Sequence, residues 1–126
     1  MSIGSVAYNA PELWELESRL AELRQRGHDP LESDYLSYDG IKADIFSAAV
    51  TLFLLKLKFQ PFRRAHPNDP YYKKLAFKSS SKYFWKIYSK GPSAITVAFK
   101  DIFEKLICHK PEGRPDSSQV LRHKFL

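Results

Sequence analysis

The sequence offers little that could fix the fold covalently or hold the chain in a membrane. It contains one cysteine in 126 residues, so an intramolecular disulfide is excluded and an oxidising compartment is not required. Its longest apolar stretch, Ile45 to Leu55, is 11 residues long, whereas a membrane-spanning helix needs about 20. Residues 1–7 lack the basic region and apolar run of a secretory signal. We therefore expect a soluble intracellular protein, cytoplasmic or nuclear, without a membrane partner.

Metal-binding and strand patterns are also missing. The four histidines are scattered, and Cys108 beside His109 has no second pair at the spacing of zinc ligands. No segment alternates between apolar and polar residues strongly enough to predict a β-strand, and no internal repeat is visible. We expect no bound metal and a fold built from helices.

The composition that remains is that of one globular domain, with 44% hydrophobic and 27% charged residues. Charge is unevenly spread, because residues 1–44 carry nine acidic and four basic side chains, whereas residues 45–126 carry five and sixteen. Between residues 71 and 88 the lysines alternate with tyrosine, phenylalanine and tryptophan. This pattern is compatible with a stacking surface for single-stranded nucleic acid. Buried aromatics below solvated lysines are the simpler interpretation, so we expect no specific nucleic-acid partner.

Two helices stand out in the first half. Leucines at 13, 16, 20 and 23 form one apolar stripe, Pro11 suits a first helical position and Gly27 a stop, which predicts a helix over Pro11 to Arg26. A second helix is predicted over Lys42 to Leu57, before Pro61. It is apolar on almost every side from Ile45 to Leu55, which is typical of the central helix of a fold.

The second half predicts shorter helices. Asp69 and Pro70 begin one that runs to about Lys78, and residues 82–88 are short helix or irregular chain. Others are predicted over about Ala94 to Ile107 and over Asp116 to Arg122, where Asp116 and Gln119 have the spacing of a capping box. The predicted fold class is all-α, with about five helices around a central apolar helix.

Several short motifs, in order, then point to a family. Gly4 to Glu12 ends in Ala-Pro-Glu, residues 38–47 contain Asp44-Ile45-Phe46-Ser47, and Gln60-Pro61-Phe62 follows. Near the end stand Pro111-Glu112-Gly113-Arg114 and Leu121-Arg122-His123-Lys124-Phe125. This series resembles the C-terminal lobe of eukaryotic-type protein kinases from the Ala-Pro-Glu segment onward. The Gly4-Ser5-x-x-Tyr8 pattern resembles the serine/threonine branch.

The resemblance implies a partial kinase domain over residues 1–126, with an extended connector at 13–37. Motifs that hold ATP and magnesium in a complete kinase are absent: there is no Gly-x-Gly-x-x-Gly, no His-Arg-Asp and no Asp-Phe-Gly. Phe46, Ala49 and Lys58 also replace the family's usual Trp, Gly and Gly. We therefore expect no catalytic, cofactor-binding or metal-binding residue in this chain, and no phosphoryl transfer by the chain alone.

Six residues match functional or structural positions of the family. Ser5, Val6 and Asn9 match substrate-binding positions around the phosphoacceptor. Glu12 and Arg114 match a buried ion pair, and Asp44 matches a carboxylate that binds the catalytic-loop backbone. Because that loop is missing, we expect Asp44 to be solvated. The catalytic partner of Ser5 is also missing, so an ordinary loop hydroxyl is the better interpretation of Ser5.

Three interpretations of such a chain remain. It is a truncated form or remnant of a complete kinase, a stand-alone interaction module, or the complement of a separately encoded upstream portion. The expected partners are accordingly a protein or peptide substrate, the missing kinase portion, or a protein bound over the central helix. That helix should be incompletely covered, because the family elements that wrap one side of it are absent.

Overall fold

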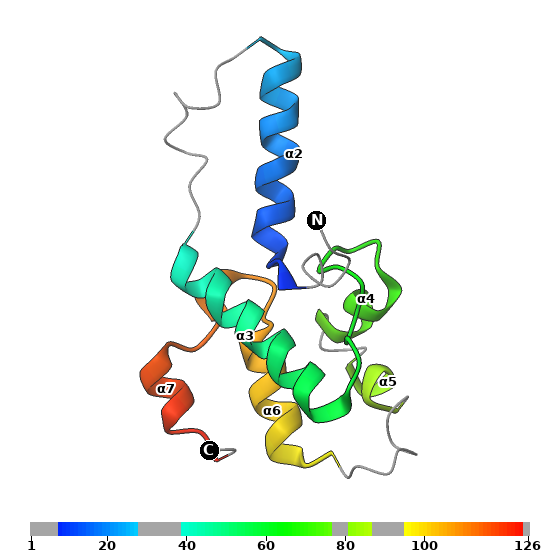
Figure 1. Ribbon diagram of the computed structural model, residues 1–126, viewed down its shortest axis with the longest axis vertical. Coiled ribbons are helices and arrows are strands. Elements are labelled where there is room, and N and C mark those ends of the chain that lie inside the picture. Colours follow the sequence, from blue (N-terminus) through cyan, green and yellow to red (C-terminus); the bar gives the residue numbers. More distant parts are fainter. Residues whose placement is uncertain (1–7, 28–38, 77–80, 87–94, 125–126) are drawn as a thin grey trace.

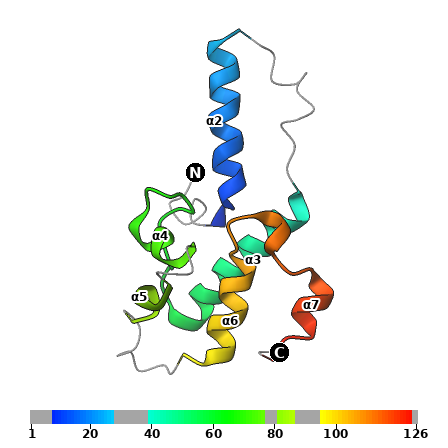
Figure 2. The same ribbon diagram turned by 180° about the vertical axis from the view of Figure 1, so that it is seen from behind.

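The computed structural model describes residues 8–27, 39–76, 81–86 and 95–124, and the ordered elements in these ranges are helical. The chain is therefore all-α, as predicted. α2 (Pro11–Gln25) stands out from the remaining helices, with only its N-terminal end against them (Figures 1 and 2). The helices in the described part of the chain are all too short or too polar to cross a bilayer.

α3 (Gly40–Leu57) is the central helix, and α6 (Val97–Leu106) packs along it (Figure 1). α3 begins two residues earlier than the sequence predicted, because the Asp39 side chain caps it by accepting from the amides of Ile41 (3.0 Å) and Lys42 (3.2 Å). It ends at Lys58, whose backbone adopts the left-handed conformation with φ of 68°. Glycine tolerates that conformation best, and glycine is what the kinase resemblance expects at this position.

The shorter elements complete the body. α4 (Pro70–Ala76) packs against α5 (Ser81–Lys86), the short 3₁₀ helix η4 (Pro111–Gly113) contacts α3, and α7 (Ser117–Leu121) is the last helix. The predicted starts of α4 and α7 are confirmed. Asp69 caps α4, and Asp116 and Gln119 form the expected capping box of α7.

Aromatic side chains build the core where α3, α5 and α6 meet. The Phe53 ring centroid lies 5.0 Å from Phe103, and Phe84, Trp85 and Phe99 lie within 6.3 Å of it. Edge-to-face and tilted arrangements of this kind add to the energy of apolar burial. Phe84 and Trp85 therefore serve mainly to pack the core. This agrees with the simpler interpretation of residues 71–88, in which the aromatic side chains are buried below solvated lysines.

α3 is covered on one side only. Phe46, Ala49, Val50 and Phe53 are buried, whereas the opposite positions are exposed, with Ile41 73% and Leu55 65% accessible. We call these opposite positions the α3 outer face. They are Ile41, Asp44, Ala48, Thr51 and Leu55. Their spacing of three and four residues places them along one stripe, which confirms that the central helix is incompletely covered.

Candidate functional site: the Glu12–Arg114 network

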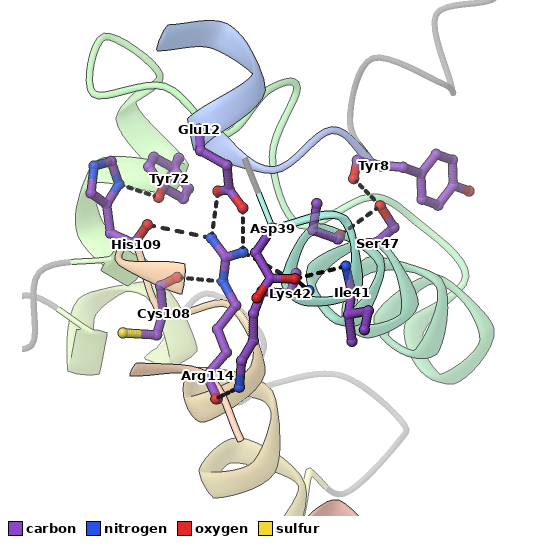
Figure 3. Close-up of polar contacts among 11 residues, drawn as sticks. Tyr8, Glu12, Asp39, Ile41, Lys42, Ser47, Tyr72, Cys108, His109 and Arg114 are labelled. Atoms are coloured by element: carbon purple, nitrogen blue, oxygen red, sulfur yellow. Dashed lines mark hydrogen bonds and ion pairs between the residues drawn. The ribbon is translucent and has the colours of Figure 1, made fainter. Parts of the chain in front are cut away.

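The Arg114 side chain joins three distant parts of the chain (Figure 3). Its guanidinium binds Glu12 through two bonds, Nη1 to Oε2 at 2.7 Å and Nη2 to Oε1 at 2.8 Å. The Arg114 side chain is fully buried and that of Glu12 is 11% accessible. This is the contact that the sequence predicted across about a hundred residues. The two-pronged geometry matches the planar fork of arginine to a carboxylate.

Three backbone carbonyls use the other donors of Arg114. Nε donates to the carbonyl of Cys108 (2.8 Å), Nη1 to that of Lys42 (3.0 Å) and Nη2 to that of His109 (3.3 Å). All five N–H groups of the guanidinium are thus bonded. A buried charge is costly unless it is paired and its remaining donors are satisfied, and here both conditions hold.

Neighbouring contacts fix the same elements from other directions. The Lys42 ammonium donates to the Arg114 carbonyl (2.6 Å), so the two residues bond reciprocally. The Ser47 hydroxyl donates to the Tyr8 carbonyl (2.7 Å), which holds the segment before α2 against α3 (Figure 3). The Phe46 ring lies 5.0 Å from the Arg114 guanidinium carbon. The network therefore fixes the base of α2, the first turns of α3 and the loop before η4.

A buried tyrosine borders the network. The Tyr72 hydroxyl lies 2.6 Å from His109 Nδ1, and burial raises the pKa of Tyr72 well above its usual range, partly offset by the Arg114 charge. The phenol therefore keeps its proton and donates a hydrogen bond to Nδ1 in the tautomer that carries its proton on Nε2. His109 Nε2 then faces Glu15 at 3.9 Å. This contact extends the network one turn along α2.

Asp69 is a second buried carboxylate, and its role is to organise the backbone. Oδ1 accepts from the amides of Tyr71 (3.0 Å) and Tyr72 (3.1 Å), and Oδ2 accepts from those of Arg63 (3.0 Å) and Arg64 (3.2 Å). The side chain thereby joins the loop after Pro61 to the start of α4. The sequence predicted the cap but not the second pair of bonds, because an N-cap motif specifies only the amides that follow it.

The predicted substrate-binding residues lie before α2. Asn9 is half-buried between Tyr8 and the buried Ala10, whereas Ser5 and Val6 lie outside the described residues. Asp44 is exposed on the α3 outer face, as expected for a carboxylate without the catalytic loop. The structure thus brings Glu12 and Arg114 together and places Asp44 apart from them.

The acidic side chains of the described residues do not gather into one metal site. No three of their histidine, cysteine, aspartate or glutamate side chains converge as metal ligands would. The five aspartates of the described residues have separate situations: Asp39, Asp69 and Asp116 cap helices, Asp101 binds His123, and Asp44 is exposed. No phosphoryl-transfer step follows from this arrangement.

Sequence reasoning missed the contact that holds the last helix. His123 Nε2 lies 2.6 Å from Asp101 Oδ2, and Lys105 Nζ lies 2.9 Å from the same oxygen. The hydrogen bond from His123, followed by that from Lys105, lowers the pKa of the Asp101 carboxyl. The Leu-x-His motif drew attention to His123, but it did not indicate which residue His123 contacts.

Comparison with known proteins supports a distant kinase relationship. No family model matches the chain. The chain is 31% identical over 127 aligned positions to the Saccharomyces cerevisiae protein "Putative serine/threonine-protein kinase YPL150W". The alignment covers 98% of this chain but 10% of the yeast protein, so the chain spans about a tenth of the length of that relative. The chain is therefore similar to a short region of a protein named as a kinase.

Proposed function

We propose that the chain forms the distal helical part of a serine/threonine kinase C-terminal lobe. The observation that carries this proposal is the buried ion pair between Glu12 and Arg114. These residues end the Ala-Pro-Glu and Pro-x-x-Arg motifs, which the kinase resemblance links. The similarity to the yeast protein along nearly the whole chain supports the same assignment. Residues 13–37 are then an extended connector, which contains most of α2.

In this proposal the chain carries part of the substrate-docking region. Ser5, Val6 and Asn9 contact a protein substrate near its phosphoacceptor. The bond from Ser47 to the Tyr8 carbonyl supports this role, because it holds the adjacent backbone on the rigid α3. The chain alone transfers no phosphate, since it lacks the motifs that position ATP and magnesium. Those ligands belong to a complete kinase.

A fusion protein tests the assignment. Residues 1–126 are joined behind the upstream portion of an established serine/threonine kinase, in place of that enzyme's own distal lobe. The proposal expects phosphorylation of a serine peptide, and loss of that activity when Glu12→Ala is introduced. A fusion that folds cooperatively but phosphorylates no peptide would contradict the proposal. The same upstream portion with its native distal lobe is the positive control.

The α3 outer face favours a second candidate, a non-catalytic interaction module. In a complete lobe this face is covered by the upstream portion, and in a module it is covered by a separate protein. Hydrogen exchange distinguishes the two. Slower exchange of the α3 amides in the fusion than in the isolated chain supports the lobe. Equal exchange in a fusion that folds but phosphorylates no peptide favours the module.

A further inference from the structure

Exposed side chains of α4 and α5 form a basic surface. We call it the α4–α5 basic face. It consists of exposed side chains, namely Tyr71, Lys73, Lys74, Lys82, Tyr83 and Lys86. Neither α4 nor α5 contains an acidic residue, and the two helices pack on one another. Their positive charge is therefore not balanced from within these two helices.

A pocket of about 480 Å³ continues this surface between α5 and α6. Three lysines line it: Lys82, Lys86 and Lys100. Both carboxylates in the lining are already engaged. Glu104 accepts from the Trp85 indole N–H at 2.7 Å, and Asp101 is bound by His123 and Lys105. The pocket thus brings three lysine side chains together beside carboxylates that accept from Trp85, His123 and Lys105.

Most aromatic rings of this region are poorly placed to stack on nucleic-acid bases, although Tyr71 and Tyr83 are 46% and 54% exposed. The Lys82 ammonium lies 5.2 Å from the centroid of the Tyr83 ring, and the Lys100 ammonium lies 5.9 Å from that of Trp85. Trp85 and Phe84 are also buried, at 6% and 0% accessibility. Recognition of single strands depends on open ring faces. Cations cover one face of these rings, so charge is the feature left for recognition.

The cations of this face are all lysines. Lysine presents a compact, mobile charge, whereas arginine presents the planar fork that suits a phosphate group. The lysines of this face and pocket are spread over three helices. They therefore suit a series of carboxylates along a flexible segment better than they suit one compact dianion. We propose that the α4–α5 basic face, with the adjoining pocket, binds an acidic protein segment rich in aspartate and glutamate. This inference is independent of the kinase assignment.

Fluorescence anisotropy tests the proposal with the full chain. The probe is a labelled peptide of about twelve residues that alternates Glu and Asp with Ser. A Gln/Asn peptide of the same length and a single-stranded oligonucleotide of equal charge are the comparisons. We expect the acidic peptide to bind tightest at low salt, and its affinity to fall steeply as ionic strength rises toward physiological values.

Matched double variants locate the site. Lys82→Glu with Lys86→Glu should weaken peptide binding by at least about tenfold. Lys110→Glu with Lys124→Glu changes the net charge equally at exposed positions before η4 and after α7, and should weaken it by less than about threefold. Far-UV circular dichroism checks folding. If the Glu variant fails to fold, Lys82→Gln with Lys86→Gln takes its place, with Lys110→Gln and Lys124→Gln as its control.

Four results would overturn the proposal. The first is equal weakening by the two pairs of substitutions, which indicates general charge attraction. The second is tighter binding of the oligonucleotide than of the acidic peptide. The third is no difference between the acidic and the Gln/Asn peptides. The fourth is self-association in sedimentation experiments that the Lys82/Lys86 substitutions abolish, because the occupant would then be a second copy of the chain.

Discussion

Arg114 shows how one side chain can close a chain of separate helices. Its guanidinium has five N–H donors, and carbonyls from two distant segments share them with Glu12. In a site that is largely shielded from water, an ion pair is most stable when every neighbouring N–H donor has an acceptor. Removal of either partner would leave the other charge buried without compensation.

Substitution of Glu12 should therefore lower the stability of the chain strongly. We expect Glu12→Ala to lower the free energy of unfolding by about 3–5 kcal/mol, because it leaves Arg114 buried and unpaired. Urea denaturation measures the change. Glu22→Ala is the matched control, since Glu22 pairs with Arg26 at 2.9 Å on the exposed side of the same helix. It should cost about 0.5 kcal/mol or less. An equal decrease in the free energy of unfolding for Glu12→Ala and Glu22→Ala would show that the buried pair stabilises the chain no more than the exposed one.

The Asp101–His123 contact predicts a dependence of stability on acid. The pKa of Asp101 is lowered from its ordinary value of 3.8 in the folded chain. Its contribution is therefore present above pH 3.8 and is lost as the pH falls through the folded-state value. Asp101→Asn should destabilise the chain by under about 1 kcal/mol near pH 5, since the carboxylate is half-exposed.

As the pH falls below 3.8, the difference between the wild type and Asp101→Asn should shrink. Thermal unfolding across this range measures it. Asp44→Asn is the control, because Asp44 is exposed on the α3 outer face. A gap between wild type and Asp101→Asn that stays constant from pH 5 to pH 2.5 would refute this origin of the pKa change.

The residue contacts were only partly predictable from the sequence. The Glu12–Arg114 pair followed from the order of two motifs, but the carbonyls of Lys42, Cys108 and His109 did not. Backbone carbonyls carry no side-chain signature, so a sequence cannot show which of them face a distant cation. Asp101 and His123 were unpredictable for a similar reason, because their contact depends on the angle at which the last helix returns to α6.

At the scale of elements, α3 ends in an unfavourable conformation. Lys58 adopts a φ of 68°, which a side chain with a β-carbon resists and which glycine accepts. We expect Lys58→Gly to stabilise the chain by about 0.5–1 kcal/mol and to raise its melting temperature. Lys56→Gly, inside the same helix, should instead cost about 1 kcal/mol. Destabilisation by Lys58→Gly would mean that the helix end is not strained.

The one-sided cover of α3 gives a second test at this scale. Phe53 is buried among four aromatic rings of α5 and α6, so Phe53→Ala should cost about 3–5 kcal/mol. Leu55 is 65% exposed on the outer face, and Leu55→Ala should change stability by about 0.5 kcal/mol or less. Chemical denaturation compares them directly. A loss at Leu55 close to that at Phe53 would indicate that the outer face is covered.

Helix positions were more predictable than helix packing. The leucine spacing, Pro11 and Gly27 predicted α2, which runs from Pro11 to Gln25, and Gly27 has a φ of 79°. Its leucines are nevertheless only half-buried and lie outside the main core. An apolar stripe specifies which face seeks a partner but not which partner it finds. α5 was ambiguous because six residues are too few to establish a helical period.

The molecule carries two proposed functional regions, one assigned to the kinase lobe and one to the docking of an acidic segment. The Glu12–Arg114 network and the α3 outer face belong to the proposed kinase lobe. The α4–α5 basic face is the proposed docking surface for an acidic segment. Most of the basic side chains of the sequence lie in residues 45–126, which include the α4–α5 basic face. Loose attraction of anions to that half is expected, and it should decrease as salt screens it.

Phosphoryl transfer by the isolated chain is the most direct test of the proposal that a kinase-like lobe is present without its nucleotide half. The purified chain is incubated with Mg-ATP and a generic serine peptide, beside a catalytically dead complete kinase as the background. We predict no phosphate incorporation above that background, because the charge-stabilising groups that transfer requires are missing. Incorporation above background would contradict the account and would indicate a phosphate site elsewhere in the chain.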